Sequence, residues 1–329
     1  MSEPSGGQYL ILDPWRHYSA GLNVRQEPDG GMRDLEFSKA KLEFDRLFGV
    51  YNSGKIGRLR HGHVKLIYSK ILEYFSWKTQ RTFRHRVQLP WGEKINVICP
   101  DTTSLDISRF GFYEEGLTRM ILDYVKPGMT FLDVGANIGY YTLMAAWLVG
   151  DNGSVHSFEP TPETFNILQS NAEQKQNVQL NKFALSSESG TIRFNDYGAH
   201  LMGRNSKFQQ NLDAKKKQNM EPVSYEVPAT TIDEYVTHND VCPDFIKIDT
   251  EHSEYDILQG MRNTLNSYHP VISIEVGDDD IEGVPSCNQI IEFLTAEGYQ
   301  AYEFRNNGFV EHLIKNRYEY DNLVFKPKG

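Results

Sequence analysis

Beyond Gly111, short apolar segments alternate along the chain with longer segments that have the spacing of amphipathic helices. This alternation is typical of a parallel sheet whose strands are joined by crossover helices. The segments that we expect to form strands are residues 130–134, 154–158, 178–185, 191–194, 244–249, 270–276, 300–304, 309–313 and 322–325. The sequence therefore predicts a doubly wound α/β domain.

The composition excludes several classes of protein. A chain of 329 residues can bury a core without disulfides or a structural metal. Its net charge of −10 disfavours nucleic acid as the main partner. Cys99, Cys242 and Cys287 form no C-x-x-C pair, which fits a reducing compartment, so we expect a cytoplasmic location. We expect no transmembrane segment and no secretion signal, whereas peripheral contact with a membrane stays open.

The first part of the chain has a different pattern, and we place a domain boundary near residue 86. Residues 1–86 read as a helical extension, and residues 87–329 as the α/β domain. In the extension, helix-like segments at 35–51 and 64–80 are separated by the glycine-containing segment 52–57. The domain begins with two alternating segments around Trp91-Gly92, which predict a hairpin.

The end of this extension is strongly basic. Glu73 is the one acidic residue between Lys55 and Arg86. The basic residues are Lys55, Arg58, Arg60, Lys65, Lys70, Lys78, Arg81, Arg84 and Arg86. One interpretation is a packed helical extension with a solvated basic face. The other is a surface for an anionic acceptor, or for the lipid headgroups that hold a lipid-linked one.

A glycine-rich turn follows the first predicted strand of the α/β domain. Residues 133–139 read Asp-Val-Gly-Ala-Asn-Ile-Gly, which lacks the middle glycine of the dinucleotide fingerprint G-x-G-x-x-G. Glycines allow a ligand to approach the backbone closely. Asp133 would repel phosphates but suits a ligand that carries an amino group and a sulfonium charge.

A second acidic residue, Glu159, ends the next predicted strand. A carboxylate at this place can accept hydrogen bonds from both hydroxyls of a ribose. Together with the glycine turn, it favours S-adenosylmethionine as cofactor, with a nicotinamide cofactor second. Either acid alone could equally be a loop or helix-capping carboxylate.

Several motifs in this order resemble those of the FkbM-type methyltransferases. They are Phe131-Leu-Asp-Val-Gly-Ala-Asn-Ile-Gly-Tyr-Tyr-Thr-Leu, Phe158-Glu-Pro, Thr230-Thr-Ile-Asp-Glu-Tyr, Ile246-Lys-Ile-Asp-Thr-Glu and Val271-Ile-Ser-Ile-Glu-Val. The resemblance runs from about Gly111 to Phe325. It implies a Rossmann-like class I methyltransferase fold with an antiparallel last strand. It also implies S-adenosylmethionine as methyl donor and, usually, O-methylation of sugars or natural products.

The resemblance also implies roles for individual residues. The methionine end of the cofactor would lie against Asp133, Gly135, Ala136, Asn137 and Gly139. Glu159 would bind the ribose, and Phe183 and Ala184 would lie near the adenine. The family usually has glycine where this chain has His252, so the active-site chemistry need not match the family average.

A sugar hydroxyl is a poor nucleophile and benefits from a base or a metal that removes its proton. We expect His252, whose unperturbed pKa is near 6.5, to be this base, with Glu251 second. Asp249 ends a strand at the same edge and joins these catalytic candidates. Alternatively, His252 only caps the following helix or forms local hydrogen bonds.

Acidic residues near the same strand ends could bind a divalent cation. Asp249, Glu275 and the run 278–280, which begins with Asp278, offer oxygen ligands for Mg²⁺. The alternative is a solvated acidic loop. Glu275 should also face the acceptor, as should His200 and Arg204 in the polar insert at 195–225. This insert is either an acceptor-binding lid or a non-specific loop.

The predicted function is methyl transfer from S-adenosylmethionine to a sugar hydroxyl of a glycan or glycosylated natural product. A polyketide, a lipid or a nitrogen atom is the alternative acceptor. A protein that binds the cofactor without catalysis and serves in assembly is a further alternative. A dehydrogenase is disfavoured by Asp133 and by the missing glycine. Homo-oligomer formation stays open.

Overall fold

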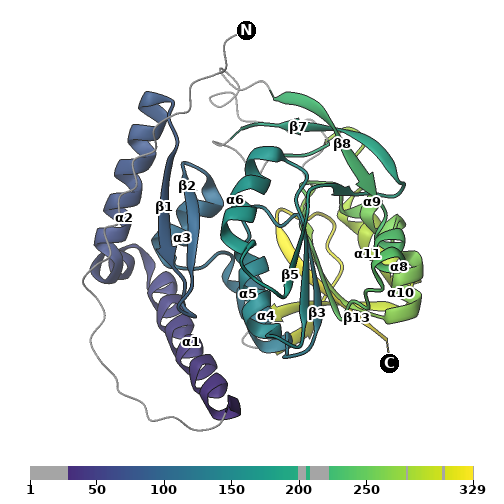
Figure 1. Cartoon of the computed structure of the whole chain (residues 1–329), viewed down its shortest axis with the longest axis horizontal. Coiled ribbons are helices and arrows are strands. Elements are labelled where there is room, and N and C mark those ends of the chain that lie inside the picture. The colour runs from purple at the N-terminus through teal and green to yellow at the C-terminus, as the bar shows by residue number, and fades with distance from the viewer. Residues whose placement is uncertain (1–28, 199–204, 208–221, 279–280, 306–307, 329) are drawn as a thin grey trace. The chain divides into compact units, whose positions relative to one another are not determined.

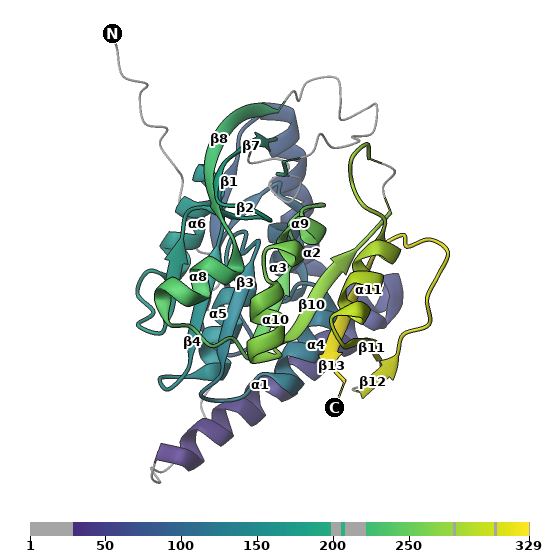
Figure 2. The same ribbon diagram turned by 90° about the vertical axis from the view of Figure 1, so that its right-hand side faces the viewer.

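The computed structural model describes residues 29–198, 205–207, 222–278, 281–305 and 308–328 (Figures 1 and 2). It divides into two compact units, Met1–Tyr113 and Glu114–Gly329. The division between the units follows Tyr113, and the predicted hairpin belongs to the first unit, where it packs with the helices before and after it.

The first unit consists of three helices and one hairpin within its described residues. The helices are α1 (Asp29–Asn52), α2 (Gly54–Thr79) and α3 (Thr102–Phe110), and the strands are β1 (Phe83–Gln88) and β2 (Lys94–Cys99). The antiparallel hairpin is confirmed, with Val87 opposite Ile95. The expected separation of two helices by the segment 52–57 is wrong, because only Ser53 lies between α1 and α2.

Aromatic side chains form much of the core of this unit. Phe44 and Phe48 of α1 stack at 5.6 Å between ring centroids, and Phe48 meets Phe112 edge-on at 4.7 Å. Asp101 begins α3 by accepting a hydrogen bond of 2.8 Å from the Ser104 backbone N–H. The unit thus has a buried core of its own.

The second unit is built on an eight-stranded sheet with the order β12-β11-β13-β10-β9-β3-β4-β5. Its strands are β3 (Thr130–Val134), β4 (Ser154–Phe158), β5 (Val178–Asn181), β9 (Phe245–Ile248), β10 (Val271–Val276), β11 (Tyr299–Arg305), β12 (Gly308–Glu311) and β13 (Asp321–Pro327). Strands β5, β4, β3, β9 and β10 are parallel, whereas β13 runs antiparallel between β10 and β11. The mostly parallel sheet with an antiparallel last strand is confirmed.

Helices cover both faces of this sheet (Figure 1). One face carries α4 (Glu115–Tyr124), α5 (Tyr140–Val149) and α6 (Pro162–Ala172). The other carries α8 (Ile232–Asn239), α9 (Glu254–Gln259), α10 (Arg262–Tyr268) and α11 (Cys287–Ala296). The apolar strands are therefore buried on both sides, as in a Rossmann-like class I methyltransferase fold.

A second, three-stranded sheet was not predicted. It has the order β6-β8-β7, with β6 (Ala184–Leu185), β7 (Gly190–Asp196) and β8 (Val223–Thr230). The expected strand at 178–185 splits because the chain leaves the main sheet after Asn181 and pairs Ala184 with Ala229 of β8. The beginning of β8 lies in the segment that we expected to be a polar insert. This small sheet lies beyond the carboxyl ends of the parallel strands (Figure 1).

Among the described residues, no helix has both the length and the apolar character needed to span a membrane.

Candidate functional site

The glycine turn between β3 and α5 has a backbone that few other residues would allow. Gly135 and Gly139 have φ values of +76° and +92°. A Cβ atom on Gly135 would lie 1.8 Å from the backbone oxygen of Asp249. The turn is tied to β4, because the backbone N–H groups of Gly135 and Ala136 both donate to the Phe158 carbonyl, at 3.1 and 3.0 Å. The turn is thus fixed by backbone contacts on two sides.

Asp133 lies beneath this turn and is 0% exposed. Its carboxylate accepts a hydrogen bond of 2.6 Å from the Thr142 hydroxyl of α5 and lies 3.4 Å from Lys247 Nζ. One oxygen of the Asp133 carboxylate is thus hydrogen-bonded to α5, and the other, Oδ1, is buried beside Lys247 without a hydrogen-bond partner among the described residues. A direct contact between Asp133 and a ligand stays a prediction.

Lys247 on β9 is the residue at this site that the sequence analysis missed. Its ammonium donates 3.1 Å to the Gly135 carbonyl and lies 3.3 Å from Asp249 and 3.4 Å from Asp133. Burial opposes the charged form, but Asp249 and Asp133 outweigh it and raise the pKa of Lys247. The signal in the sequence is a lone lysine inside an apolar strand, where an unpaired charge would be very costly.

Glu159 follows β4, and its side chain contacts both the glycine turn and the segment after β4. Its carboxylate accepts hydrogen bonds from the backbone N–H groups of Asn137, at 3.2 Å, and Thr161, at 3.0 Å, and from the Thr161 hydroxyl. Burial raises the pKa of Glu159 to about 7 although these donors lower it, and the Asp196 charge raises it further. The carboxylate that we predicted for a ribose is therefore brought next to the turn.

Asn137, in the same turn, has a buried polar side-chain atom. Its backbone is left-handed, with φ +49°, and its side-chain Oδ1 is buried. Within the residues that the structure describes, this oxygen has no hydrogen-bond partner. Such an acceptor is costly to leave unsatisfied, so it fits a ligand that donates a hydrogen bond here.

Asp249 directly follows β9, Glu275 lies near the end of the neighbouring strand β10, and their side chains are hydrogen-bonded to each other. Burial raises the pKa of the Glu275 carboxyl well above its ordinary value, and the charge of Asp249 and a hydrogen bond to it add to the increase. The side chain of Asp249 is 22% exposed and lies beside Lys247. The two carboxyls therefore favour a state in which Glu275 holds a proton and Asp249 is paired with a cation.

The turn after β9 contains Glu251 and His252. Both are left-handed without being glycine, with φ values of +54° and +81°. The turn is supported by Glu254, whose carboxylate accepts from the backbone N–H of Thr250 at 2.7 Å. The Ser206 hydroxyl donates to the Glu251 carbonyl. The structure thus brings all three predicted catalytic residues to one edge of the sheet.

The predicted Mg²⁺ site is not supported. Within the described part of the chain, no three or more His, Cys, Asp or Glu side chains are arranged to hold a metal ion. Asp278 accepts hydrogen bonds from the backbone N–H groups of Cys287, at 2.9 Å, and Tyr318, at 2.9 Å, so its carboxylate links the first residue of α11 to the segment before β13. Its neighbours in the acidic run, residues 279 and 280, lie outside the described residues.

The predicted acceptor residues His200 and Arg204 also lie outside the described residues. The segment 205–207 of the same insert is described and contacts the turn after β9. Lys207 forms an ion pair with Asp256, and burial lowers the pKa of this lysine to about 8, although Glu254 counteracts the effect. Glu275, the third predicted acceptor residue, lies near the end of β10 beside Asp249.

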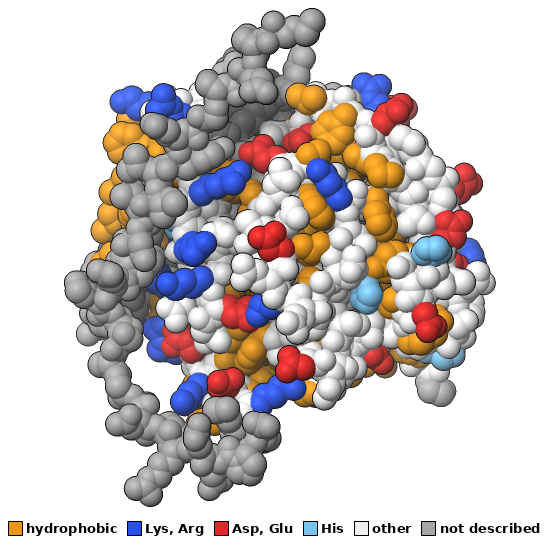
Figure 3. Space-filling view, viewed as in Figure 1, with side chains coloured by type: hydrophobic (Ala, Val, Ile, Leu, Met, Phe, Trp, Pro, Cys, Tyr) orange, Lys and Arg blue, Asp and Glu red, His pale blue; other side chains and the backbone are white. Residues whose placement is uncertain are grey.

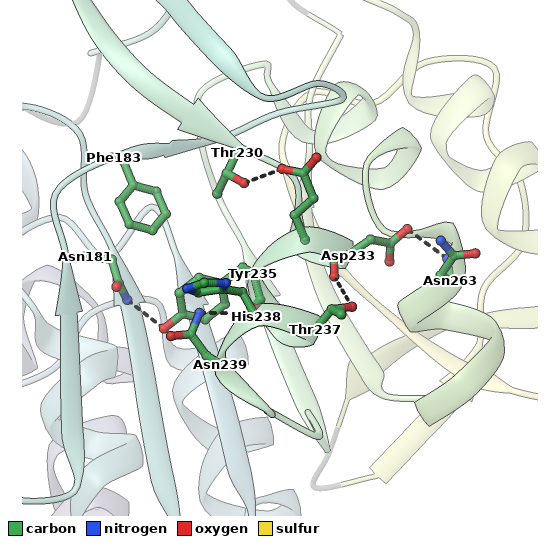
Figure 4. A pocket seen from close by; sticks show the side chains of 10 residues that line it. Asn181, Phe183, Thr230, Asp233, Tyr235, Thr237, His238, Asn239 and Asn263 are labelled. Atoms are coloured by element: carbon green, nitrogen blue, oxygen red, sulfur yellow. Dashed lines mark hydrogen bonds between the residues drawn. The ribbon is translucent and has the colours of Figure 1, made fainter.

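The predicted adenine residues lie at the end of β5. Phe183 packs edge-on against Phe158 at 5.7 Å, whereas Ala184 is buried in the small sheet. Phe183 also lines a cavity of about 780 Å³ around α8 (Figure 4). Many polar groups of this cavity bond to one another, such as Asn181 to the Tyr235 hydroxyl at 3.2 Å. None of the residues lining this cavity belongs to the glycine turn.

Comparison with known proteins gives a consistent result. Residues 133–301, just over half of the chain, match the model of the methyltransferase FkbM domain. The chain is 28% identical to the hexuronic acid methyltransferase AglP of Haloferax volcanii over 169 residues, 50% of this chain and 64% of that protein. The match therefore spans less than two thirds of this relative.

Two further similar proteins carry the name FkbM. The 31-O-demethyl-FK506 methyltransferase FkbM of Streptomyces tacrolimicus is 26% identical over 200 residues, 53% of this chain and 74% of that protein. The crystal structure of a methyltransferase FkbM from Methylobacillus flagellatus has 14% identity and a TM-score of 0.40. It covers 67% of this chain and 52% of that chain.

Proposed function

Because the chain belongs to the methyltransferase FkbM domain family, we propose that it transfers a methyl group from S-adenosylmethionine to a hydroxyl of an acceptor. The observation that carries this proposal is the pairing of two acceptor groups at adjacent strand ends. Asn137 Oδ1 is buried in the glycine turn, and the Glu159 carboxylate lies directly beside the turn. S-adenosylmethionine offers an ammonium group and two ribose hydroxyls as donors.

These residues would hold the cofactor by hydrogen bonds and by shape. The turn residues Gly135, Asn137 and Gly139 would bind its methionine end, and Glu159 its ribose. Phe183 would lie against the adenine. When bound, S-adenosylmethionine supplies an electrophilic methyl group on a cationic sulfur. The acidic residues that gather at this edge, among them Asp249, suit that positive charge.

For the acceptor, we propose a sugar hydroxyl on a glycan or glycosylated natural product. The similar protein AglP is named as a hexuronic acid methyltransferase, and the similar FkbM by an O-demethyl substrate. Both names favour an oxygen acceptor over a nitrogen atom. A screen of acceptors separates sugars from polyketides and lipids: the product gains the mass of one methyl group in place of a hydrogen.

The hydroxyl proton needs an acceptor at the same edge of the sheet. We propose His252 as this base, because it belongs to the turn after β9 that also contains Asp249 and Glu251. Asp249 would lie beside Lys247, whose Nζ is 3.3 Å away, and Glu275, whose pKa burial raises well above its ordinary value, would keep its own proton. Asp249, which is partly exposed and paired with Lys247, therefore replaces Glu251 as the second candidate for the base.

Single substitutions distinguish the two candidates. His252→Ala should abolish turnover and leave the affinity for S-adenosylmethionine nearly unchanged, measured by release of S-adenosylhomocysteine and by calorimetry. His269→Ala, at an exposed histidine after α10, is the matched control. Full activity of His252→Ala with loss of activity in Asp249→Asn would move the role to Asp249.

Calorimetry on the unmodified chain tests the proposal as a whole. Binding of S-adenosylmethionine and not of NAD is the expected result. Preference for NAD would contradict the proposed cofactor. Binding of S-adenosylmethionine without turnover on any acceptor would instead favour a protein that serves in assembly.

A further inference from the structure

Helix α2 presents an apolar face to solvent along most of its length. Six of its hydrophobic side chains are between 48% and 84% exposed. They are Ile56, Val64, Ile67, Ile71, Tyr74 and Phe75. Part of this region is visible at the left margin of Figure 3, where α2 lies in Figure 1. Exposed apolar patches of this kind mark interaction sites on soluble proteins.

The spacing of these residues places them on one side of the helix. Ile67, Ile71 and Tyr74 follow one another at intervals of four and three residues, so they share a face. The other side of α2 is fixed to its own unit. Arg109 of α3 donates to the buried Ser69 hydroxyl at 3.0 Å, and the buried Ser76 hydroxyl lies 3.4 Å from the Cys99 carbonyl. The apolar face is therefore not used to pack this unit.

Basic residues accompany the apolar face. Lys70 and Lys78 are exposed on the same helix, and Arg81 and Arg86 are exposed just after it. Glu73, the one acid in this stretch, pairs with Arg109 at 2.7 Å on the packed side. The exposed face of α2 thus combines hydrophobic side chains with positive charge.

The two units of the chain also differ in net charge, and the unit that contains α2 is the positive one. Residues 1–113 contain 17 Lys and Arg against 12 Asp and Glu, whereas residues 114–329 contain 17 against 32. An anionic surface would therefore attract the first unit and repel the second. Such asymmetry between parts of a chain is typical of proteins that bind nucleic acids or membranes.

We propose that the apolar face of α2 docks the protein onto a bilayer that contains anionic lipids. Hydrophobic side chains of an interfacial helix enter the boundary between headgroups and acyl chains, while lysines meet lipid phosphates. Tyr74 and Trp77 at the end of α2 have the amphipathic rings that are enriched at this depth. A bilayer fits better than a second copy of α2, because pairing two copies would bring Lys70 and Lys78 near their equivalents.

Co-sedimentation of the full chain with vesicles tests this proposal without any need for turnover. We expect binding to vesicles of phosphatidylcholine mixed with phosphatidylglycerol, and much weaker binding to phosphatidylcholine alone. The double change Lys70→Glu and Lys78→Glu should weaken partitioning by at least about tenfold. Lys94→Glu, at an exposed lysine of β2, is the matched control and should have a smaller effect.

A second pair of variants tests the apolar contribution. The double change Ile67→Glu and Ile71→Glu should abolish vesicle binding, whereas Leu42→Glu, at an exposed leucine of α1, should leave it largely unchanged. Circular dichroism checks that each variant stays folded. Equal binding by the Ile67→Glu, Ile71→Glu variant would overturn the proposal. A dimer that this variant dissociates, with no vesicle binding by the unmodified chain, would overturn it in favour of a second copy.

Discussion

Two turns at the carboxyl edge of the main sheet both contain left-handed residues, but of different types. The glycine turn after β3 reaches its left-handed conformations mainly with Gly135 and Gly139, which have no Cβ to clash. The turn after β9 reaches them with Glu251 and His252, for which positive φ is strained. The first turn is thus specified locally, whereas the second depends on support from the rest of the unit.

Lys247 connects the two turns by pairing with an acidic residue at each of them, and these two acidic residues differ in their exposure to solvent. Its ammonium holds Asp133 beneath the first turn and Asp249 beside the second. Asp133 is fully buried, whereas the side chain of Asp249 is 22% exposed. One cation therefore stabilises one acid that supports the fold and one that remains accessible for chemistry.

The largest effect should come from removing this shared cation. Lys247→Met leaves the buried charge of Asp133 uncompensated, which we expect to reduce the free energy of unfolding by about 3–5 kcal/mol. Denaturant unfolding measures this change. Lys126→Met, at an exposed lysine, is the control. Adding Asp133→Asn to Lys247→Met should recover part of the loss, and no recovery would contradict the charge argument.

The next effect should come from the first turn. Gly135→Ala places a Cβ 1.8 Å from the Asp249 carbonyl at a φ of +76°. We expect a loss of about 2–5 kcal/mol in stability and loss of S-adenosylmethionine binding. Gly128→Ala is the matched control, because its φ is +87° but no atom lies within 4 Å of the added Cβ. Equal losses in both variants would show that close approach to Asp249 is unimportant.

The first turn could be predicted from the sequence, and the second could not. The glycines of the first turn can be read directly from the sequence. Strands β3 and β4 begin and end at the expected residues, because each is a short apolar run bounded by polar residues. The conformation of Glu251 and His252 follows from distant partners such as Ser206, which no local pattern reveals. The pairing of Ala184 with Ala229 is similarly non-local, so the small sheet escaped prediction.

The role of Lys247 could not be predicted for the same reason, namely that it depends on contacts between strands that are distant in the sequence. The lysine is evident in the motif, but only the register of β3 beside β9 shows that it reaches two acids at once. The predicted Mg²⁺ site depended on counting acids near strand ends. Counting does not reveal that Asp278 is bonded to the backbone N–H groups of Cys287 and Tyr318.

A smaller effect on stability and on cofactor affinity should come from the titration of Glu159 beside the first turn. The pKa of Glu159 is raised to about 7, so the folded protein binds this proton more tightly than an unfolded chain does. As pH rises from about 4.5 through 7, the unliganded protein should therefore lose stability. Affinity for S-adenosylmethionine should rise through the same region, because only the carboxylate accepts two ribose hydroxyls. Calorimetry at several pH values should show this rise, and Glu159→Gln should remove it.

The smallest effect should come from the second turn. His252→Gly relieves a side chain at φ +81°, and we expect a gain of about 1 kcal/mol in stability, seen as a small rise in melting temperature. His269→Gly is the matched control, because its φ of +49° lies within the ordinary left-handed region. A larger gain in stability for His252→Gly than for His269→Gly, together with loss of turnover, would mean that the strained backbone at His252 serves the reaction. A gain in stability with full turnover would show that neither the strained backbone nor the side chain of His252 takes part in the reaction.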